Sequence, residues 1–128
     1  MFHVVNDIER IGDHAENIID LTSEKIEKRI QFSDDATYDI KHLFNYTLDS
    51  LTRTIEGFES NDVERSQSVM YVEEKIDNLE EQLRETNIRR LNKGTCNANA
   101  SAIFLDIINN FERVGDHCTN IAQTVINR

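Results

Sequence analysis

Apolar residues recur along the chain at alternating steps of three and four, the spacing of one face of an α-helix. Four such stripes follow one another: Val4 to Leu21, Ile40 to Phe58, Val69 to Leu83, and Phe104 to Val125. The chain has no proline and only four glycines, the two residue types that most often interrupt helices. The pattern therefore predicts an all-α protein built from long helices.

The breaks between the stripes fall where residues suited to helix ends occur. Ser33 can cap a helix start, as can Ser60 or Asp62 before the third stripe, and Gly94 suits the left-handed conformation that ends a helix. These signals predict four helices, near residues 1–30, 34–59, 62–93 and 98–127. Because the connectors are short, consecutive helices must run antiparallel. The expected fold is an antiparallel bundle of four long helices.

Composition narrows the classes of partner and compartment. The 128 residues carry 24 acidic and 14 basic side chains, a net charge of −10, which argues against a nucleic-acid-binding module and favours metal ions or basic protein surfaces as partners. Two cysteines are too few for a disulfide framework, so we expect a reduced, cytoplasmic chain. No apolar run approaches the roughly 20 residues of a membrane span. We expect no direct membrane insertion of this segment, which leaves open a cytosolic domain of an inner-membrane protein.

The two ends of the chain contain copies of the same short sequence. Residues 6–18 and 109–121 match at 8 of 13 positions, at an offset of 103 residues. The polar positions match better than the apolar ones, which is the reverse of what shared core packing alone would produce. The repeat therefore indicates a shared role of its polar residues as well as a shared helix face.

Each copy of the repeat carries two carboxylates one helical turn apart, Glu9 and Asp13 in the first and Glu112 and Asp116 in the second. Residues at this spacing stand about 6 Å apart, and like charges there are mildly destabilising. A bound cation is one physical reason to accept the repulsion, because hard cations take carboxylate oxygens. The alternative is a solvated acidic face on which Arg10 and Arg113 pair with the aspartates.

The third helix offers the same Glu-x-x-x-Asp spacing at Glu73 and Asp77, beside its own apolar stripe. Gly115 lies between the stripe and the acidic face of the last helix, where the lack of a side chain would let a neighbouring helix approach closely. We therefore predict a metal site formed by Glu73 and Asp77 facing Glu112 and Asp116. Their oxygens suit Mg²⁺, Ca²⁺ or Mn²⁺.

The repeated Glu-Arg-Ile-Gly-Asp-His-Ala-x-Asn-Ile stretch resembles the motif of the phosphate-uptake regulator PhoU family. The likeness is closer still to the PhoU-like cytosolic tail of bacterial sodium/phosphate cotransporter proteins. That likeness rests on residues 87–96, 103–106 and 110–117 and covers essentially the whole chain. It implies tandem three-helix repeats that bind multinuclear clusters of divalent or iron ions through the Glu/Asp-x-x-x-Asp motif, and a phosphate transporter or its membrane domain as partner.

In that family the motif helix closes each repeat. By resemblance, residues 1–30 are the last helix of a truncated first repeat, and residues 34–128 are a complete second repeat. Glu9 and Asp13 are then candidate ligands without the helix that normally faces them. Because the apolar stripe of the first helix would be covered on one side only, we also expect a homo-oligomer.

Two other function classes stay open from the residues. A carboxylate-bridged di-metal enzyme would carry Glu-x-x-His on two helices, and Asp39-x-x-His42 is the nearest approximation. A histidine phosphotransfer bundle would use His14 or His117, but their neighbours Asp13 and Asp116 are acidic, whereas a phosphorylated histidine needs lysine or arginine nearby. We interpret both histidines as surface or packing residues rather than ligands, and we expect the protein not to be an enzyme.

Overall fold

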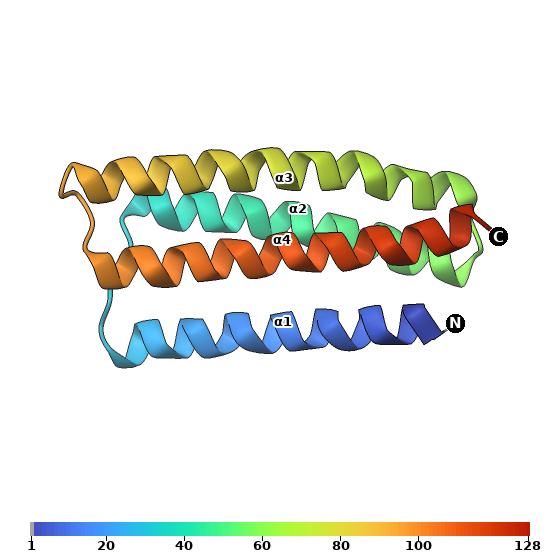
Figure 1. Cartoon of the computed structure of the whole chain (residues 1–128), viewed down its shortest axis with the longest axis horizontal. Helices are drawn as coiled ribbons and strands as arrows, with labels where there is room; N and C mark the ends of the chain where they lie inside the picture. The colour runs from blue at the N-terminus through green and yellow to red at the C-terminus, as the bar shows by residue number, and fades with distance from the viewer. Residues whose placement is uncertain (1) are drawn as a thin grey trace.

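The computed structural model describes residues 2–128 and contains four long helices connected by short turns (Figure 1). They are α1 (Phe2–Glu27), α2 (Asp34–Glu59), α3 (Val63–Asn92) and α4 (Ala98–Ile126). Consecutive helices run in opposite directions, which confirms the all-α antiparallel bundle. The first helix ends at Glu27, a few residues before the predicted end, because the chain turns at Arg29 with a φ of 55°. Within residues 2–128, no helix is both long enough and apolar enough to cross a membrane.

The starts of α2 and α3 are capped by side chains that the sequence indicated. Ser33 Oγ accepts a hydrogen bond from the backbone N–H of Ala36 at 3.1 Å, and Asp62 Oδ1 accepts one from Arg65 at 3.0 Å. Gly94 has a φ of 73°, which a residue with a side chain rarely adopts. These local signals fix the helix ends and therefore the register in which α3 and α4 face each other.

The core lies between α2, α3 and α4. Its largest fully buried side chains come from all three helices and include Leu43, Ile76, Phe104 and Ile108. Helix α4 is central, because it packs against each of the other three helices. The acidic face of α4 is thereby held at a fixed distance from α3.

Helix α1 lies along the lower edge of the bundle (Figure 1). Among the described helices its backbone approaches only α4. The contact includes two polar side-chain pairs. His14 Nδ1 lies 2.9 Å from Asn110 Oδ1, and His117 Nδ1 lies 2.9 Å from Asp7 Oδ1. The two histidine rings stack with centroids 5.5 Å apart. Because residues 7 and 14 are the repeat counterparts of 110 and 117, α1 and α4 pack about a local twofold axis.

Candidate metal centre

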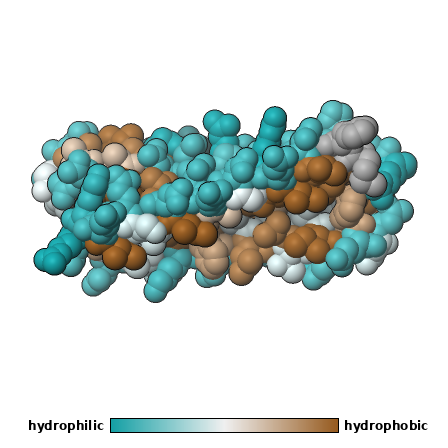
Figure 2. Space-filling model, turned by 90° about the horizontal axis from the view of Figure 1, so that it is seen from below, coloured by the Kyte–Doolittle hydropathy of each residue, from teal (hydrophilic) through white to brown (hydrophobic). Residues whose placement is uncertain are grey.

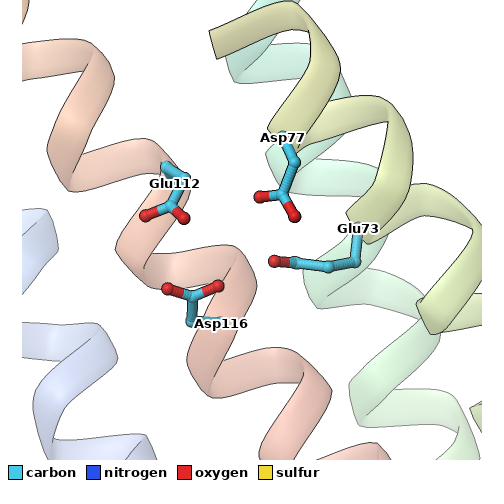
Figure 3. Close-up of side chains that lie close together, drawn as sticks. All are labelled: Glu73, Asp77, Glu112 and Asp116. Carbon is cyan, nitrogen blue, oxygen red and sulfur yellow. The ribbon is translucent and has the colours of Figure 1, made fainter. Parts of the chain in front are cut away.

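Four carboxylates meet midway along the contact between α3 and α4 (Figure 3). Glu73 and Asp77 project from α3, and Glu112 and Asp116 project from α4 toward them. One oxygen from each residue can be chosen so that all four atoms lie within 4.8 Å of one another. The i, i+4 spacing aligns each pair on one helix face, and the antiparallel packing of the two helices brings the pairs together. These are the four residues that the sequence predicts for the site.

Gly115 provides the room for this arrangement. A Cβ atom at Gly115 would stand 2.6 Å from Oε2 of Glu73 and 3.3 Å from Cδ1 of Ile76. The Glu73 carboxylate therefore lies directly over the glycine, as the sequence predicts for a close approach of two helices. Oε2 of Glu73 is buried and has no hydrogen-bond partner among the described residues. A buried carboxylate oxygen without a partner is costly unless a proton or a cation satisfies it.

The electrostatics of the cluster favour neutralisation. Burial raises the pKa of Glu73 to about 9, and the neighbouring carboxylates of Asp116 and Asp77 add to the shift. Burial and the charge of Asp116 raise the pKa of Glu112 to about 7. The pKa of Asp77 is also raised, first by burial and then by Asp116. Mutual repulsion in a partly buried site makes a bound cation the natural counterion.

No lysine or arginine within residues 2–128 forms an ion pair with any of the four carboxylates. In particular Arg113, which the alternative interpretation pairs with Asp116, forms no such contact. The nearby acidic residue Glu80 adds further negative charge to Asp77 and Glu112, although Arg84 Nε donates a hydrogen bond to it at 3.0 Å. The donor set, four carboxylates with one buried oxygen unsatisfied, fits a hard cation such as Mg²⁺, Ca²⁺ or Mn²⁺.

We expect the metal-free protein to lose stability as pH rises. Since the pKa values of Glu73 and Glu112 stand above their ordinary value of 4.5, the folded chain binds more protons than the unfolded chain between about pH 4.5 and the raised values. The free energy of unfolding therefore falls with increasing pH in that window. The measurement is thermal melting in chelator from about pH 5 to pH 8. Glu73→Gln should flatten the profile, and a wild-type melting temperature that stays level would contradict the crowding of these carboxylates.

The first copy of the motif has a different environment. Glu9 and Asp13 are exposed on α1, and neither belongs to a cluster of potential metal ligands in the described part of the chain. No other helix of residues 2–128 faces them, since α1 packs only on α4. The structure thus assembles four of the six candidate ligands and leaves Glu9 and Asp13 apart.

The polar residues beside the motif hold α1 against α4. His14 and His117 are half-buried in that contact, as expected for packing residues, and Asn17 and Asn120 donate hydrogen bonds to Asn110 Oδ1 and Asp7 Oδ1. The sequence interpretation missed the roles of Asp7 and Asn110, the acceptors of this network. They occupy one position of the repeat, where the two copies differ, so matching identities gave no signal.

The protein is therefore an all-α bundle in which paired Glu-x-x-x-Asp carboxylates face each other across two antiparallel helices. Comparison with known proteins places it more narrowly, because the PhoU domain family matches residues 40–125. The chain belongs to the PhoU domain family.

Proteins related over nearly the whole chain carry the same family name. A phosphate-specific transport system accessory protein, PhoU homolog 1 of Thermotoga maritima, is 30 % identical over 121 residues, which are 94 % of this chain and 51 % of that protein. A PhoU homolog of Rhizobium meliloti is 25 % identical over 126 residues, 95 % of this chain and 51 % of that protein. The chain spans about half the length of these relatives. No solved structure matches it.

Proposed function

We propose that this chain is a non-enzymatic, metal-binding regulatory domain of phosphate uptake. The observation that carries the proposal is the cluster of Glu73, Asp77, Glu112 and Asp116, which brings four carboxylates together without a basic partner in the described residues. The names of the relatives support the regulatory part, because they are accessory proteins of phosphate-specific transport systems. All four groups are carboxylates, and a role in binding a cation accounts for every one of them.

The ligands favour a hard cation. All four groups offer oxygen, which suits Mg²⁺, Ca²⁺ and Mn²⁺, and iron is included because the family resemblance implies it. Carboxylates can also bridge, so more than one ion can share the four groups. A bound ion would tie α3 to α4 midway along their length and neutralise the charges that otherwise repel there.

The partner we propose is a phosphate transporter or its membrane domain. The sequence resemblance favours the cytosolic tail of a sodium/phosphate cotransporter. We also propose a cytoplasmic location, because two cysteines are too few for a disulfide framework, and a homo-oligomeric state, because the apolar stripe of α1 is covered on one side only within the described residues. Reading the coding sequence upstream of residue 1 tests the tail assignment. Membrane-spanning segments encoded upstream in the same reading frame would support it. An in-frame stop codon between residue 1 and any such segment would oppose it.

Elemental analysis tests the metal site directly. The protein is purified without a histidine tag or chelator, and the metal content per chain is compared for wild type and Glu73→Gln. We expect a stoichiometric divalent or iron ion in the wild type and much less in the variant, because Glu73 carries the buried, unpartnered oxygen. Metal-free wild type that also takes up no Mn²⁺, Mg²⁺ or Fe²⁺ on titration would oppose the proposal.

A transport assay tests the regulatory part separately. Phosphate uptake is measured in cells that produce the transporter together with wild-type chain or with Asp116→Asn, at equal protein levels. We expect the wild-type chain to change the uptake rate and the variant to change it less. An uptake rate that is unaffected by the wild-type chain would contradict regulation even where the metal site is real.

A further inference from the structure

A cavity lies at the end of the bundle where the α1–α2 and α3–α4 connectors run (Figure 1). Its volume is about 300 Å³, at the lower end of the range for small-molecule sites. The lining comes from residues between 31 and 104, so α1 takes no part in it, and it is separate from the four carboxylates midway along α3 and α4. Figure 2 shows this end of the molecule, at the left, covered largely by hydrophilic side chains.

The charge of the cavity lining differs from that of the chain. The chain carries 24 acidic side chains and a net charge of −10, yet the described residues that line the cavity include no aspartate or glutamate. The one charged residue in the lining is Arg90, and the polar ones around it, which include Asn87, Asn97 and Ser101, are neutral. A cavity that lacks carboxylates in so acidic a chain disfavours a cation and favours an anion.

Arg90 supplies a hydrogen-bond donor that lacks an acceptor. Its Nη2 atom donates a hydrogen bond to Oδ2 of Asp39 at 3.2 Å. Its Nη1 atom is buried and has no hydrogen-bond partner among residues 2–128. A guanidinium group stays charged in proteins, and a buried donor without an acceptor costs free energy. An anion in the adjoining cavity would supply the missing acceptor and part of the missing negative charge.

The start of α4 lies at the same cavity. Asn97, the N-cap residue of α4, belongs to the lining, and its Oδ1 accepts a hydrogen bond from the backbone N–H of Ala100 at 2.8 Å. The Nδ2 group of Asn97 has no acceptor among the described residues and can donate to a ligand. The first N–H groups of a helix carry a partial positive charge that attracts anions. A helix start is common by itself, but this one shares a cavity with a buried arginine.

A buried polar pair adds a donor between α3 and α4. Asn87 and Ser101 are each 3 % exposed, and Asn87 Nδ2 donates a hydrogen bond to Ser101 Oγ at 2.6 Å. The proton of the Ser101 hydroxyl has no acceptor among the described residues, so it is available to a ligand. Donors from the end of α3 and the start of α4 therefore meet at one cavity. Several donors on different elements suit a tetrahedral oxyanion, which has several oxygens that accept hydrogen bonds.

Another part of the lining is apolar. The rings of Phe32 and Phe104 pack edge to face with their centroids 5.9 Å apart, and Ala36 also lines the cavity. Apolar walls exclude water and strengthen a charged hydrogen bond next to them. They also offer a surface on which a small organic group can pack.

We propose that this cavity binds a phosphate group, either as inorganic phosphate or on a small organic molecule, with Arg90, Asn97 and Ser101 as its hydrogen-bond donors. The cavity gives a role to residues 87–96, a stretch on which the family resemblance rests and to which the metal site assigns none. Binding at the cavity does not depend on the metal centre, because the two share no residue. Sensing of phosphate at this cavity by a regulatory domain does rest on the proposed function.

Calorimetric titration of the whole chain with inorganic phosphate tests the proposal. The chain is freed of metal first, so that an ion at the four carboxylates cannot hold the phosphate. We expect saturable binding of about one phosphate per chain, which Arg90→Gln weakens by about tenfold or more because a charged donor is lost. Arg89→Gln is the matched control, since Arg89 is the exposed neighbour, carries the same charge and does not line the cavity. It should change the affinity less than about twofold.

Asp39→Asn should strengthen phosphate binding. Asp39 is the acidic partner of Arg90, and its removal takes away a negative charge that opposes the anion. We expect the affinity to rise about two- to fivefold. A gain cannot come from a failure to fold, so this variant remains decisive even where Arg90→Gln is unstable. Asp49→Asn loses a similar ion pair, with Arg53, outside the cavity and should leave the affinity unchanged.

Phenyl phosphate distinguishes the two sources of the phosphate group. Tighter binding of phenyl phosphate than of inorganic phosphate would assign the cavity to an organic phosphate, because its ring would pack on Phe32 and Phe104. Equal or weaker binding would assign the cavity to free phosphate. The proposal is overturned if neither compound binds saturably up to about 10 mM. It is also overturned if Arg90→Gln and Arg89→Gln weaken binding equally, or if Asp39→Asn weakens it, and each of these results would leave the metal site unaffected.

Discussion

Asp116→Asn should abolish most of the stabilisation that a metal ion gives the protein. At a hundredfold excess over the dissociation constant, an ion that binds only the folded chain stabilises it by about 2.7 kcal/mol. For a chain of this length that corresponds to a rise of about 10 °C in the melting temperature. The variant removes one of four ligands, so its shift with Mn²⁺ or Fe²⁺ should be small. Without metal it should be no less stable than wild type, because Asp116 is exposed and its charge is repelled by its neighbours.

The repeat supplies a matched control for this experiment. Asp13 occupies the same position in the first copy of the motif and is also exposed, and within residues 2–128 it belongs to no carboxylate cluster. Asp13→Asn should therefore keep the full metal-induced shift, and Glu9→Gln should behave alike. Equal shifts for wild type and Asp116→Asn would mean that the face is merely solvated and acidic.

Gly115→Ala should weaken metal binding without destabilising the folded chain. Alanine in place of a mid-helix glycine contributes about 0.5–1 kcal/mol through helix propensity. The new methyl group, however, would stand 2.6 Å from Oε2 of Glu73, so that carboxylate must move aside. The folded chain tolerates this movement because the displaced group is the far end of a flexible side chain. Metal affinity should fall by about ten- to hundredfold, the size of effect seen when a group that orients a metal ligand is lost.

Gly12→Ala is the control, because the added methyl group meets nothing within 4 Å. It should raise the melting temperature of the metal-free chain through the same gain in helix propensity and leave metal affinity unchanged. Both variants are measured by calorimetric titration with Mn²⁺. Unaltered affinity in Gly115→Ala would show that the position of Glu73 over the glycine does not matter for binding.

The helices could be predicted because their signals are local. Apolar periodicity located all four, and Ser33, Asp62 and Gly94 fixed ends that the structure reproduces. The end of α1 was set three residues too late, since the turn at Arg29 uses a positive φ at a residue type with no preference for it. The four carboxylates were found because each pair is an i, i+4 spacing on one helix. Their meeting follows once α3 and α4 are antiparallel.

Contacts between helices that are far apart in the sequence could not be predicted in the same way. The pairing of His14 with Asn110, and of His117 with Asp7, depends on the packing of α1 against α4, which no local pattern encodes. Glu80 of α3 was not included in the site predicted from the sequence, whereas the structure places its negative charge near Asp77 and Glu112. A difference of one position changes the direction of a side chain by about 100° on a helix, so the flank that faces a neighbour depends on the rotation of the helix in the bundle.

Among residues 2–128, α1 is attached to a single neighbouring helix, α4, so we expect it to open before the other helices. Elements with few partners unfold locally at a lower free energy than the core, so amides of α1 should exchange with solvent before those of α2, α3 and α4. The exposed turn at Lys28 and Arg29 would then be the first place where trypsin cuts. Release of α1 would uncover the α4 residues behind it, Asn110 and His117 among them.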